Sequence, residues 1–314
     1  MNALLAGGDE AGARVALLAD SDDWWDAEPP PPEQLARVAR AGSLREAMDL
    51  LGMGRVADYF AYRWSDPTYL ASLALLQQHW PGGRPVVEVA CGAGHLLREL
   101  AGRGCTDLLG VDVVWAKLWL ARRFVCPQAR YVCADVTALP ALDVAPPAYV
   151  MCHDAAYFFP DKPAAFAALR SLARSGGTLV VGHAHVQDPH GVPETPQRWA
   201  ELAGEGAVLY DDDALTRALL ADRPPDSAGP DQLAASEAIG LVAGAPGARA
   251  PYDLGCPTGE TRPNPLYVDG ALAWPNERYA SEYGPRSGYL APHLEPLPPD
   301  AARRRMLLDL PDHW

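Results

Sequence analysis

Apolar runs alternate with amphipathic stretches through the middle of the chain. Each apolar run ends at a polar or glycine-rich turn, which is typical of strands buried in a parallel sheet. Such strands are expected at residues 85–90, 107–111, 129–133, 148–152 and 177–183. Apolar positions at three- and four-residue spacing predict helices over residues 96–103, 115–124 and 162–173. Alternating strands and helices indicate repeated βαβ units, so we expect an α/β fold with a largely parallel sheet.

Three regions of the chain differ in composition. Residues 1–53 contain an acidic, tryptophan-bearing stretch, consecutive prolines at 29–32 and then a helical pattern, which we interpret as an N-terminal helical cap. Residues 54–190 form the expected core domain. Residues 191–314 are rich in Pro and Gly and predict a loop-rich C-terminal extension that completes the sheet in part. Within this extension a helix is expected at 214–220 and a strand at 238–242.

The first predicted strand runs into a glycine turn and then a helix. Gly92 and Gly94 let the backbone pass close under a ligand, and the helix beyond them presents free N–H groups to it. The second strand leads into Asp112, 20 residues after Gly92. In such a fold this position presents a carboxylate to the ribose hydroxyls of a cofactor. The spacing fits NAD and S-adenosylmethionine (SAM) alike.

Two residues near this turn distinguish between these cofactors. Leu97 occupies the position of the third glycine in a dinucleotide-binding fingerprint. Glu88 lies at the strand end immediately before the turn, where a carboxylate can bind a cationic amino group but repels a pyrophosphate. Both features favour SAM over NAD.

The turn and its acids resemble those of the class I SAM-dependent methyltransferases, in which the first strand enters an acid-x-x-x-Gly-x-Gly motif. Asp112 matches the ribose-binding acid of that family and Asp135 the acid that contacts adenine, and the match continues through residues 150–154 and 175–179. The resemblance implies a Rossmann-like, seven-stranded sheet with helices on both faces, SAM as the cofactor and S-adenosylhomocysteine as its product. It implies a cofactor site made of Glu88, Ala90, Gly92, Gly94, Asp112, Val113, Asp135, Val136 and His153.

Methyl transfer from a sulfonium is a direct displacement, so the enzyme mainly aligns the acceptor and, where needed, removes its proton. Ligands in such folds bind beyond the carboxyl ends of adjacent strands. The residues after the fourth and fifth strands are therefore the expected catalytic groups, with a His or Asp as general base. These candidates are His153, Asp154, Tyr157 and His183.

The histidines of the fifth strand also raise the question of a metal. His183 and His185 are two residues apart and so point to one face of their strand. With His153, Asp154 and Asp188 they would offer a divalent ion a set of ligands. Because histidines on inner strands are more often hydrogen-bonded core or rim residues, the sequence predicts no metal site.

Two outer segments combine aromatic and polar residues. Residues 59–64 precede the helix that leads into the first strand and are expected either to close over the cofactor or to pack as an ordinary helix. Residues 264–267 and 274–279 are typical of a substrate-facing loop, of an interface or of a surface wrap. We expect the extension to contribute to the acceptor site.

The net charge of the chain limits the classes of binding partner that we expect. With 26 Lys and Arg against 40 Asp and Glu, the net charge of -14 repels a phosphate backbone and excludes nucleic acid as the expected substrate. No signal segment or membrane span is recognised, so we expect a cytoplasmic protein without a membrane partner. The six cysteines form no C-x-x-C pair, which argues against disulfides and structural zinc.

These observations predict a SAM-dependent methyltransferase that acts on a small molecule, such as a sugar or another secondary metabolite. A SAM-binding fold with a cyclase-like or regulatory role stays open, because intact acids do not exclude it. An NAD-dependent oxidoreductase is disfavoured by Glu88 and by the missing third glycine. The methylated atom and the oligomeric state are not determined by the sequence.

Overall fold

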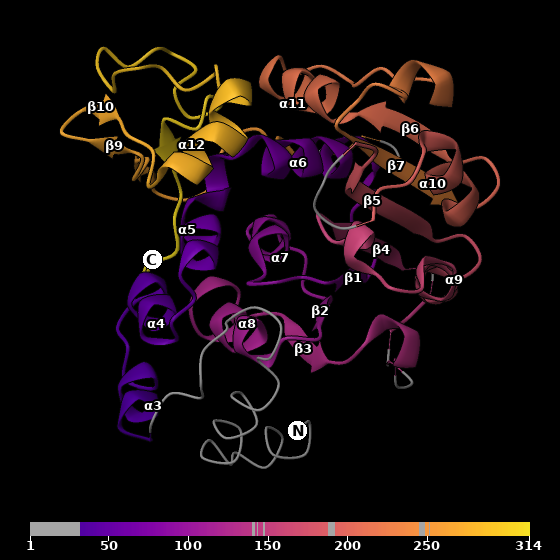
Figure 1. The fold of residues 1–314 in the computed structure, drawn as a ribbon, viewed down its shortest axis with the longest axis horizontal. Coiled ribbons are helices and arrows are strands. Elements are labelled where there is room, and N and C mark those ends of the chain that lie inside the picture. The colour runs from indigo at the N-terminus through magenta and orange to yellow at the C-terminus, as the bar shows by residue number, and fades with distance from the viewer. Residues whose placement is uncertain are drawn as a thin grey trace.

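The computed structural model describes residues 32–139, 142, 144–146, 148–187, 192–244, 249–250 and 252–314. The acidic and proline-rich start of the predicted cap, residues 1–31, lies outside the described residues. Asp188, one of the candidate metal ligands, also lies outside them. The described residues form an α/β fold around one large sheet (Figure 1).

The central sheet has seven strands in the order β3-β2-β1-β4-β5-β7-β6. The strands are β1 Val86–Val89, β2 Leu108–Asp112, β3 Arg130–Cys133, β4 Tyr149–His153, β5 Thr178–His185, β6 Val208–Asp211 and β7 Ala238–Gly244. β1 to β5 pair in parallel, whereas β7 runs antiparallel to β5 and β6. The predicted seven-stranded, largely parallel sheet is confirmed. Strand order reverses between β1 and β4, which is where ligands bind in open α/β sheets.

Side chains of the central strands alternate between two hydrophobic clusters, one on each face of the sheet. Val86 and Met151 belong to the cluster that includes helices of the N-terminal half, and Val87 and Val150 belong to the cluster that includes the helices after β4. Because both faces are covered, the central strands are largely apolar, and their polar residues include Glu88, Asp112 and His153. The prediction of helices on both faces is confirmed (Figure 1).

The helices begin at capping residues where the sequence supplies them. They are α3 Pro32–Val38, α4 Leu44–Leu50, α5 Arg55–Tyr62, α6 Pro67–His79, α7 His95–Ala101, α8 Trp115–Leu120, α9 Lys162–Ala173, α10 Pro196–Ala203, α11 Asp212–Leu220 and α12 Glu277–Tyr283. Asp66, for example, caps α6 by accepting a 2.6 Å hydrogen bond from the Tyr69 N–H, with Pro67 in the first helical position. α8 is shorter than the predicted 115–124, because residues 121–125 continue as a π-helical turn.

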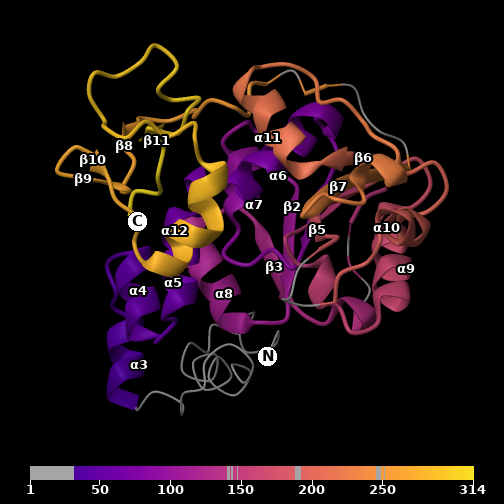
Figure 2. The same ribbon diagram turned by 45° about the horizontal axis from the view of Figure 1, so that its top comes forward.

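The C-terminal extension returns to the N-terminal helices. α12 lies beside α5 (Figure 2). The Trp314 indole N–H donates to the Ala61 carbonyl at 2.8 Å, and the Tyr289 hydroxyl donates to the Ser65 carbonyl at 2.6 Å. Two short antiparallel pairs, β8 Arg262–Pro263 with β11 Leu307–Leu308 and β9 Tyr267–Val268 with β10 Ala271–Leu272, stiffen the loops. Each helix in the described part of the chain is too short or too polar to span a bilayer.

Candidate active site

The glycine turn after β1 adopts the conformation that its sequence predicts. Ala90, Gly92 and Gly94 all have positive φ angles, of 57°, 54° and 78°. A Cβ atom at Gly92 would lie 3.1 Å from the ring of Phe60 on α5. Glycine is therefore required both by the backbone conformation and by the close approach of α5, which covers the turn.

Glu88 is a buried acid at the end of β1. Its side chain is 4% exposed, and its Oε2 atom has no hydrogen-bond partner among the described residues. Burial raises the pKa of this carboxyl to about 8, although the Arg63 guanidinium and the Leu97 N–H act in the opposite direction. A buried carboxylate oxygen without a hydrogen-bond partner is costly, so this position suits a cationic ligand.

Asp112 and Asp135 follow Glu88 across the sheet, at the ends of β2 and β3. Asp112 is buried, and its two oxygens accept hydrogen bonds from the N–H groups of Gly92 at 2.9 Å and Val114 at 2.8 Å. These bonds fix the carboxylate and leave a lone pair on each oxygen for a further donor. Asp135 is exposed, and its hydrogen bonds from Thr137 hold its pKa below the usual value.

A valine directly follows each of two of these acids, Asp112 and Asp135. Val113, directly after Asp112, is 54% exposed, which is unusual for a large aliphatic side chain at a strand end. Val136, directly after Asp135, is buried. Val113 therefore offers an apolar face beside the acid at the end of β2.

His153 is the last residue of β4. It is 4% exposed, and neither ring nitrogen has a hydrogen-bond partner in the described part of the chain. A Cβ atom at Gly182 on β5 would lie 2.2 Å from its Nδ1 atom, so only glycine leaves room for the imidazole. Burial, reinforced by Arg63, lowers the pKa of His153 to about 3, and the ring is therefore neutral.

Asp154 lies immediately beyond β4 with a φ angle of 54°. Its Oδ2 accepts the Tyr59 hydroxyl at 2.6 Å and the Arg63 guanidinium at 3.1 Å, and its Oδ1 accepts the Tyr157 hydroxyl at 2.7 Å. Burial alone would raise the pKa of this carboxyl, but His183, Arg63 and the two tyrosines outweigh it and lower the pKa to about 2. Asp154 thus joins α5 to the ends of β4 and β5.

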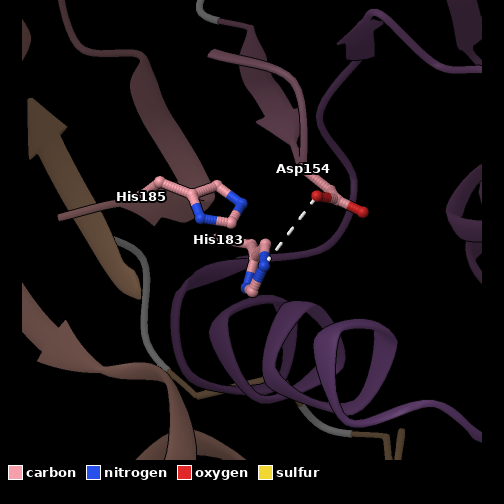
Figure 3. Close-up of side chains that lie close together, drawn as sticks. All are labelled: Asp154, His183 and His185. Carbon is pink, nitrogen blue, oxygen red and sulfur yellow. Dashed lines mark ion pairs between the residues drawn. The ribbon is translucent and has the colours of Figure 1, made fainter. Parts of the chain in front are cut away.

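His183 faces Asp154 from β5 (Figure 3). Its Nδ1 atom lies 2.5 Å from Oδ2 of Asp212, and its Nε2 atom lies 3.9 Å from Oδ1 of Asp154. Because a carboxylate accepts, Nδ1 carries the hydrogen in this pair. Burial lowers the pKa of His183, but the two carboxylates outweigh it and raise the pKa above its ordinary value. The ring of His185 lies 4.7 Å from that of His183.

Arg63, Asp212 and Arg286 complete this cluster, and the sequence analysis gave none of them a role. Arg286, from the C-terminal extension, pairs with Asp213 at 2.8 Å and with Glu237 at 2.9 Å, and its Nη2 lies 3.9 Å from Asp212. In the sequence Asp212 lies two residues before the predicted helix 214–220, which gave it no role. Arg63 was visible only as part of the aromatic segment 59–64.

Within segment 59–64, some residues pack in the core and others contact the site. Phe60 and Trp64 pack around His95, with the Trp64 and His95 rings 4.4 Å apart. Tyr59 and Arg63 of the same segment reach Asp154 instead. Segment 59–64 therefore combines ordinary helix packing with contacts to the site.

The two tail segments also differ. Asn264 is buried and binds the Arg305 carbonyl at 2.8 Å, and the Tyr267 hydroxyl donates to the Ala291 carbonyl. These bonds hold the extension together. Tyr279 of α12 packs instead against Tyr62 of α5, with ring centroids 6.0 Å apart. The second segment, but not the first, borders the helix that covers the site.

Comparisons with known proteins found a family and several solved structures that are similar to parts of this chain. A family described as a methyltransferase domain matches residues 86–177. A putative SAM-dependent methyltransferase of Methanococcus maripaludis is 17% identical, covers 41% of this chain and 62% of its own, and has a TM-score of 0.36. A SAM-bound amino pentose methyltransferase of Micromonospora echinaspora is 25% identical, with 42% and 55% covered and a TM-score of 0.33.

A third solved structure is phosphoethanolamine N-methyltransferase 2 of Haemonchus contortus in complex with SAM. It is 16% identical, with 65% of this chain and 60% of its own covered and a TM-score of 0.43. This chain thus spans less than two thirds of the length of each of these three structures. No curated protein matches the chain by sequence.

The strand order defines a Rossmann-like α/β domain, and the acids at the ends of β1, β2 and β3 lie on the side of the sheet where ligands bind in such domains. Residues 86–177 match the methyltransferase-domain family. For this stretch of the chain, the family resemblance expected from the sequence is confirmed.

Proposed function

We propose that this protein transfers the methyl group of SAM to a small-molecule acceptor bound beyond the ends of β4 and β5. One observation carries the proposal. Inside the methyltransferase domain, directly before the glycine turn, Glu88 is buried and its Oε2 atom lacks a hydrogen-bond partner among the described residues. The ammonium group of SAM supplies the missing positive charge.

The remaining cofactor contacts follow from the strand ends. Asp112, already fixed by two backbone N–H groups, receives the ribose hydroxyls on its remaining lone pairs. The exposed side chain of Val113 gives the adenine an apolar surface, and Asp135 and Val136 border its polar edge. The methionine part of SAM lies along the glycine turn.

At the acceptor end we assign His153 to contact the substrate. Of the four predicted catalytic residues, His153 is the one whose buried ring nitrogens both lack partners among the residues described. It can accept a hydrogen bond from an acceptor hydroxyl and so align the oxygen with the methyl group. Asp154, Tyr157 and His183 are bound to one another or to α5 and α11, and they shape this end of the site.

The parts of the chain outside residues 54–190 complete the acceptor site in this proposal. Residues 191–314 supply Asp212, which binds His183, and Arg286, which lies 3.9 Å from Asp212. They also supply α12, which packs against α5. A site closed by α5 suits a small acceptor such as a sugar or another metabolite. The net charge of -14 is a further argument against a nucleic-acid substrate.

Calorimetry with SAM, S-adenosylhomocysteine and NAD tests the cofactor, and transfer of radiolabelled methyl groups to a metabolite extract tests the reaction. We expect binding of the first two compounds only, and label in the small-molecule fraction. SAM binding without label transfer to any fraction would favour the cyclase-like or regulatory alternative. NAD binding in place of SAM would contradict the proposal.

Glu88 provides a second test that needs no acceptor. Because its pKa in the free protein is about 8, it is mostly protonated at pH 7. A bound ammonium group favours the carboxylate, so SAM binding releases nearly one proton per chain. Titrations in buffers of different ionisation enthalpy measure this release. Glu88→Gln abolishes it, whereas the exposed Asp135→Asn leaves it unchanged.

A further inference from the structure

Two imidazoles and a carboxylate converge at the ends of β4 and β5. Asp154, His183 and His185 each offer one ligand atom, and these atoms all lie within 4.8 Å of one another (Figure 3). His183 and His185 are buried, and Asp154 is partly buried. Ligand atoms at this separation come into the coordination sphere of one ion by small side-chain rotations.

The orientation of His183 matches that of a metal ligand. Histidines that bind metals usually donate their second ring N–H to a carboxylate, which fixes the tautomer and directs the other nitrogen at the ion. The Nδ1 atom of His183 makes this contact with Asp212 at 2.5 Å. Its Nε2 atom is thereby directed to the side of Asp154 Oδ1, 3.9 Å away.

The contacts of Asp154 leave one oxygen available to an ion. Arg63 and Tyr59 bind its Oδ2 atom, on the side of α5. Its Oδ1 atom, which faces His183, accepts one hydrogen bond from Tyr157. An ionised carboxylate oxygen has a second lone pair, so Oδ1 can coordinate an ion while both tyrosines and Arg63 stay in place.

The surrounding charge favours a cation. Three carboxylates, of Asp66, Asp154 and Asp212, lie around two guanidinium groups, of Arg63 and Arg286. Arg286 is also shared with two further carboxylates. The Oδ2 atom of Asp66 and the Oδ1 atom of Asp212 are buried without a hydrogen bond from any described residue. Carboxylates therefore outnumber guanidinium groups in this cluster, and the excess negative charge favours a bound cation.

We propose that Asp154, His183 and His185 bind one divalent transition-metal ion, contrary to the expectation from the sequence that no metal site is present. Two imidazole nitrogens and one carboxylate oxygen suit Zn²⁺, Mn²⁺ or Fe²⁺, whereas Mg²⁺ and Ca²⁺ prefer oxygen ligands alone. Asp212 is a positioning residue that acts through His183.

The role of the ion rests on the proposed methyl transfer. With three protein ligands, open coordination positions remain for an acceptor oxygen, whose O–H the ion polarises. The bond from this oxygen to the methyl carbon forms as the carbon–sulfur bond breaks. The electron pair stays on sulfur, which gives S-adenosylhomocysteine, and the acceptor proton passes to solvent.

Metal binding is measured on the full chain, freed of ions by a chelator and without SAM. We expect Zn²⁺ and Mn²⁺ each to bind at one ion per chain in calorimetry and equilibrium dialysis. His183→Ala and His185→Ala each weaken binding at least tenfold, and Asp212→Asn weakens it about 10- to 100-fold. The exposed His293 and His313 provide matched controls, because His293→Ala and His313→Ala leave affinity unchanged.

Co²⁺ absorption in the unmutated protein covers the case in which a variant fails to fold. Visible ligand-field bands that saturate at one Co²⁺ per chain and are displaced by Zn²⁺ support the site. Absence of such bands overturns it, as does binding that is lost in His293→Ala or His313→Ala but kept in folded His183→Ala.

The two proposals fail separately. The SAM affinity of the metal-free protein tests the cofactor site, and ion binding in the absence of SAM tests the metal site. If label transfer stops when a chelator is added and returns with Zn²⁺ or Mn²⁺, the ion takes part in the methyl transfer. Full transfer of label by the metal-free protein overturns the assigned role of the ion.

Discussion

The two ends of the candidate site differ in how the charges of their buried carboxylates are paired. At the end formed by β1, β2 and β3, Glu88 is buried without a partner for Oε2 within the described residues, and Asp112 accepts hydrogen bonds from two backbone N–H groups. At the end formed by β4 and β5, Asp154 contacts Tyr59, Arg63, Tyr157 and His183. At the first end a carboxylate oxygen lacks a partner from the described residues, whereas at the second end the carboxylate of Asp154 is already paired with Arg63 before any ion binds.

The two ends also differ in how far apart their residues lie in the sequence. The cofactor end consists of one strand, one turn and the next strand end, so its residues are close in the sequence. The acceptor end joins groups that are 91 residues apart in the pair of Arg63 and Asp154 and 29 residues apart in the pair of His183 and Asp212. Charge removal should therefore have opposite effects on stability at the two ends.

The largest expected effect is at the compensated end. Asp154→Asn leaves the buried Arg63 guanidinium without its closest carboxylate, because Asp66 lies farther away at 3.7 Å. We expect the free energy of unfolding of the metal-free protein to fall by about 3 kcal/mol. Urea unfolding measures this change. The exposed pair of Arg130 and Asp107 is the control, and Asp107→Ala should cost less than about 1 kcal/mol.

At the cofactor end, Glu88→Gln should change stability in the opposite direction. The pKa of Glu88 rises from its usual 4.5 to about 8 on folding, so the unfolded chain loses this proton first as pH increases. Stability of the free protein therefore falls between pH 4.5 and pH 8, by the Glu88 contribution alone, and levels off above that range.

Glutamine does not ionise, so the variant lacks this loss. We expect Glu88→Gln to unfold like the unmutated protein near pH 4.5 and to be more stable by about 1–3 kcal/mol at pH 8. Urea unfolding across this pH range measures the difference. A variant that is less stable at pH 8 would show that Glu88 already has an internal cationic partner and would remove the contrast between the two ends.

Asp112→Ala tests the cofactor end by affinity. Its carboxylate is buried and aligned, so loss of the ribose contacts should weaken SAM binding about 10- to 100-fold, measured by calorimetry. Asp135→Ala is the matched comparison. Because Asp135 is exposed, its removal should change affinity less than about threefold. Unchanged affinity in a folded Asp112→Ala protein would contradict the ribose assignment.

His153→Ala lies between the two ends and has the smallest expected effect. We expect turnover to fall about tenfold, because one hydrogen bond to the acceptor is lost, while SAM affinity stays within about threefold. Single-turnover label transfer separates the two quantities. His153→Asn, which keeps a polar side chain, should restore part of the rate, and a wild-type rate in His153→Ala would remove the residue from the acceptor site.

The sequence by itself determined the strands that carry the cofactor end. Its five predicted core strands match β1 to β5 within about two residues at each end, because buried parallel strands are apolar throughout and end at polar turns. Glu88, Gly92 and Asp112 were found by spacing alone, since the turn that joins them is local. The short β6, Val208–Asp211, was missed because it lies in a loop-rich region.

Tertiary structure decided the acceptor end. A bulge in β5 lets Val181 and Ala184 share one core cluster, which shifts the alternation of the strand before His185. Asp212 reaches His183 only because β6 and β7 add to the sheet in antiparallel order. Arg63 reaches Asp154 only because α5 folds over the glycine turn. Local spacing specifies a motif, but contacts between distant segments depend on how the whole chain packs.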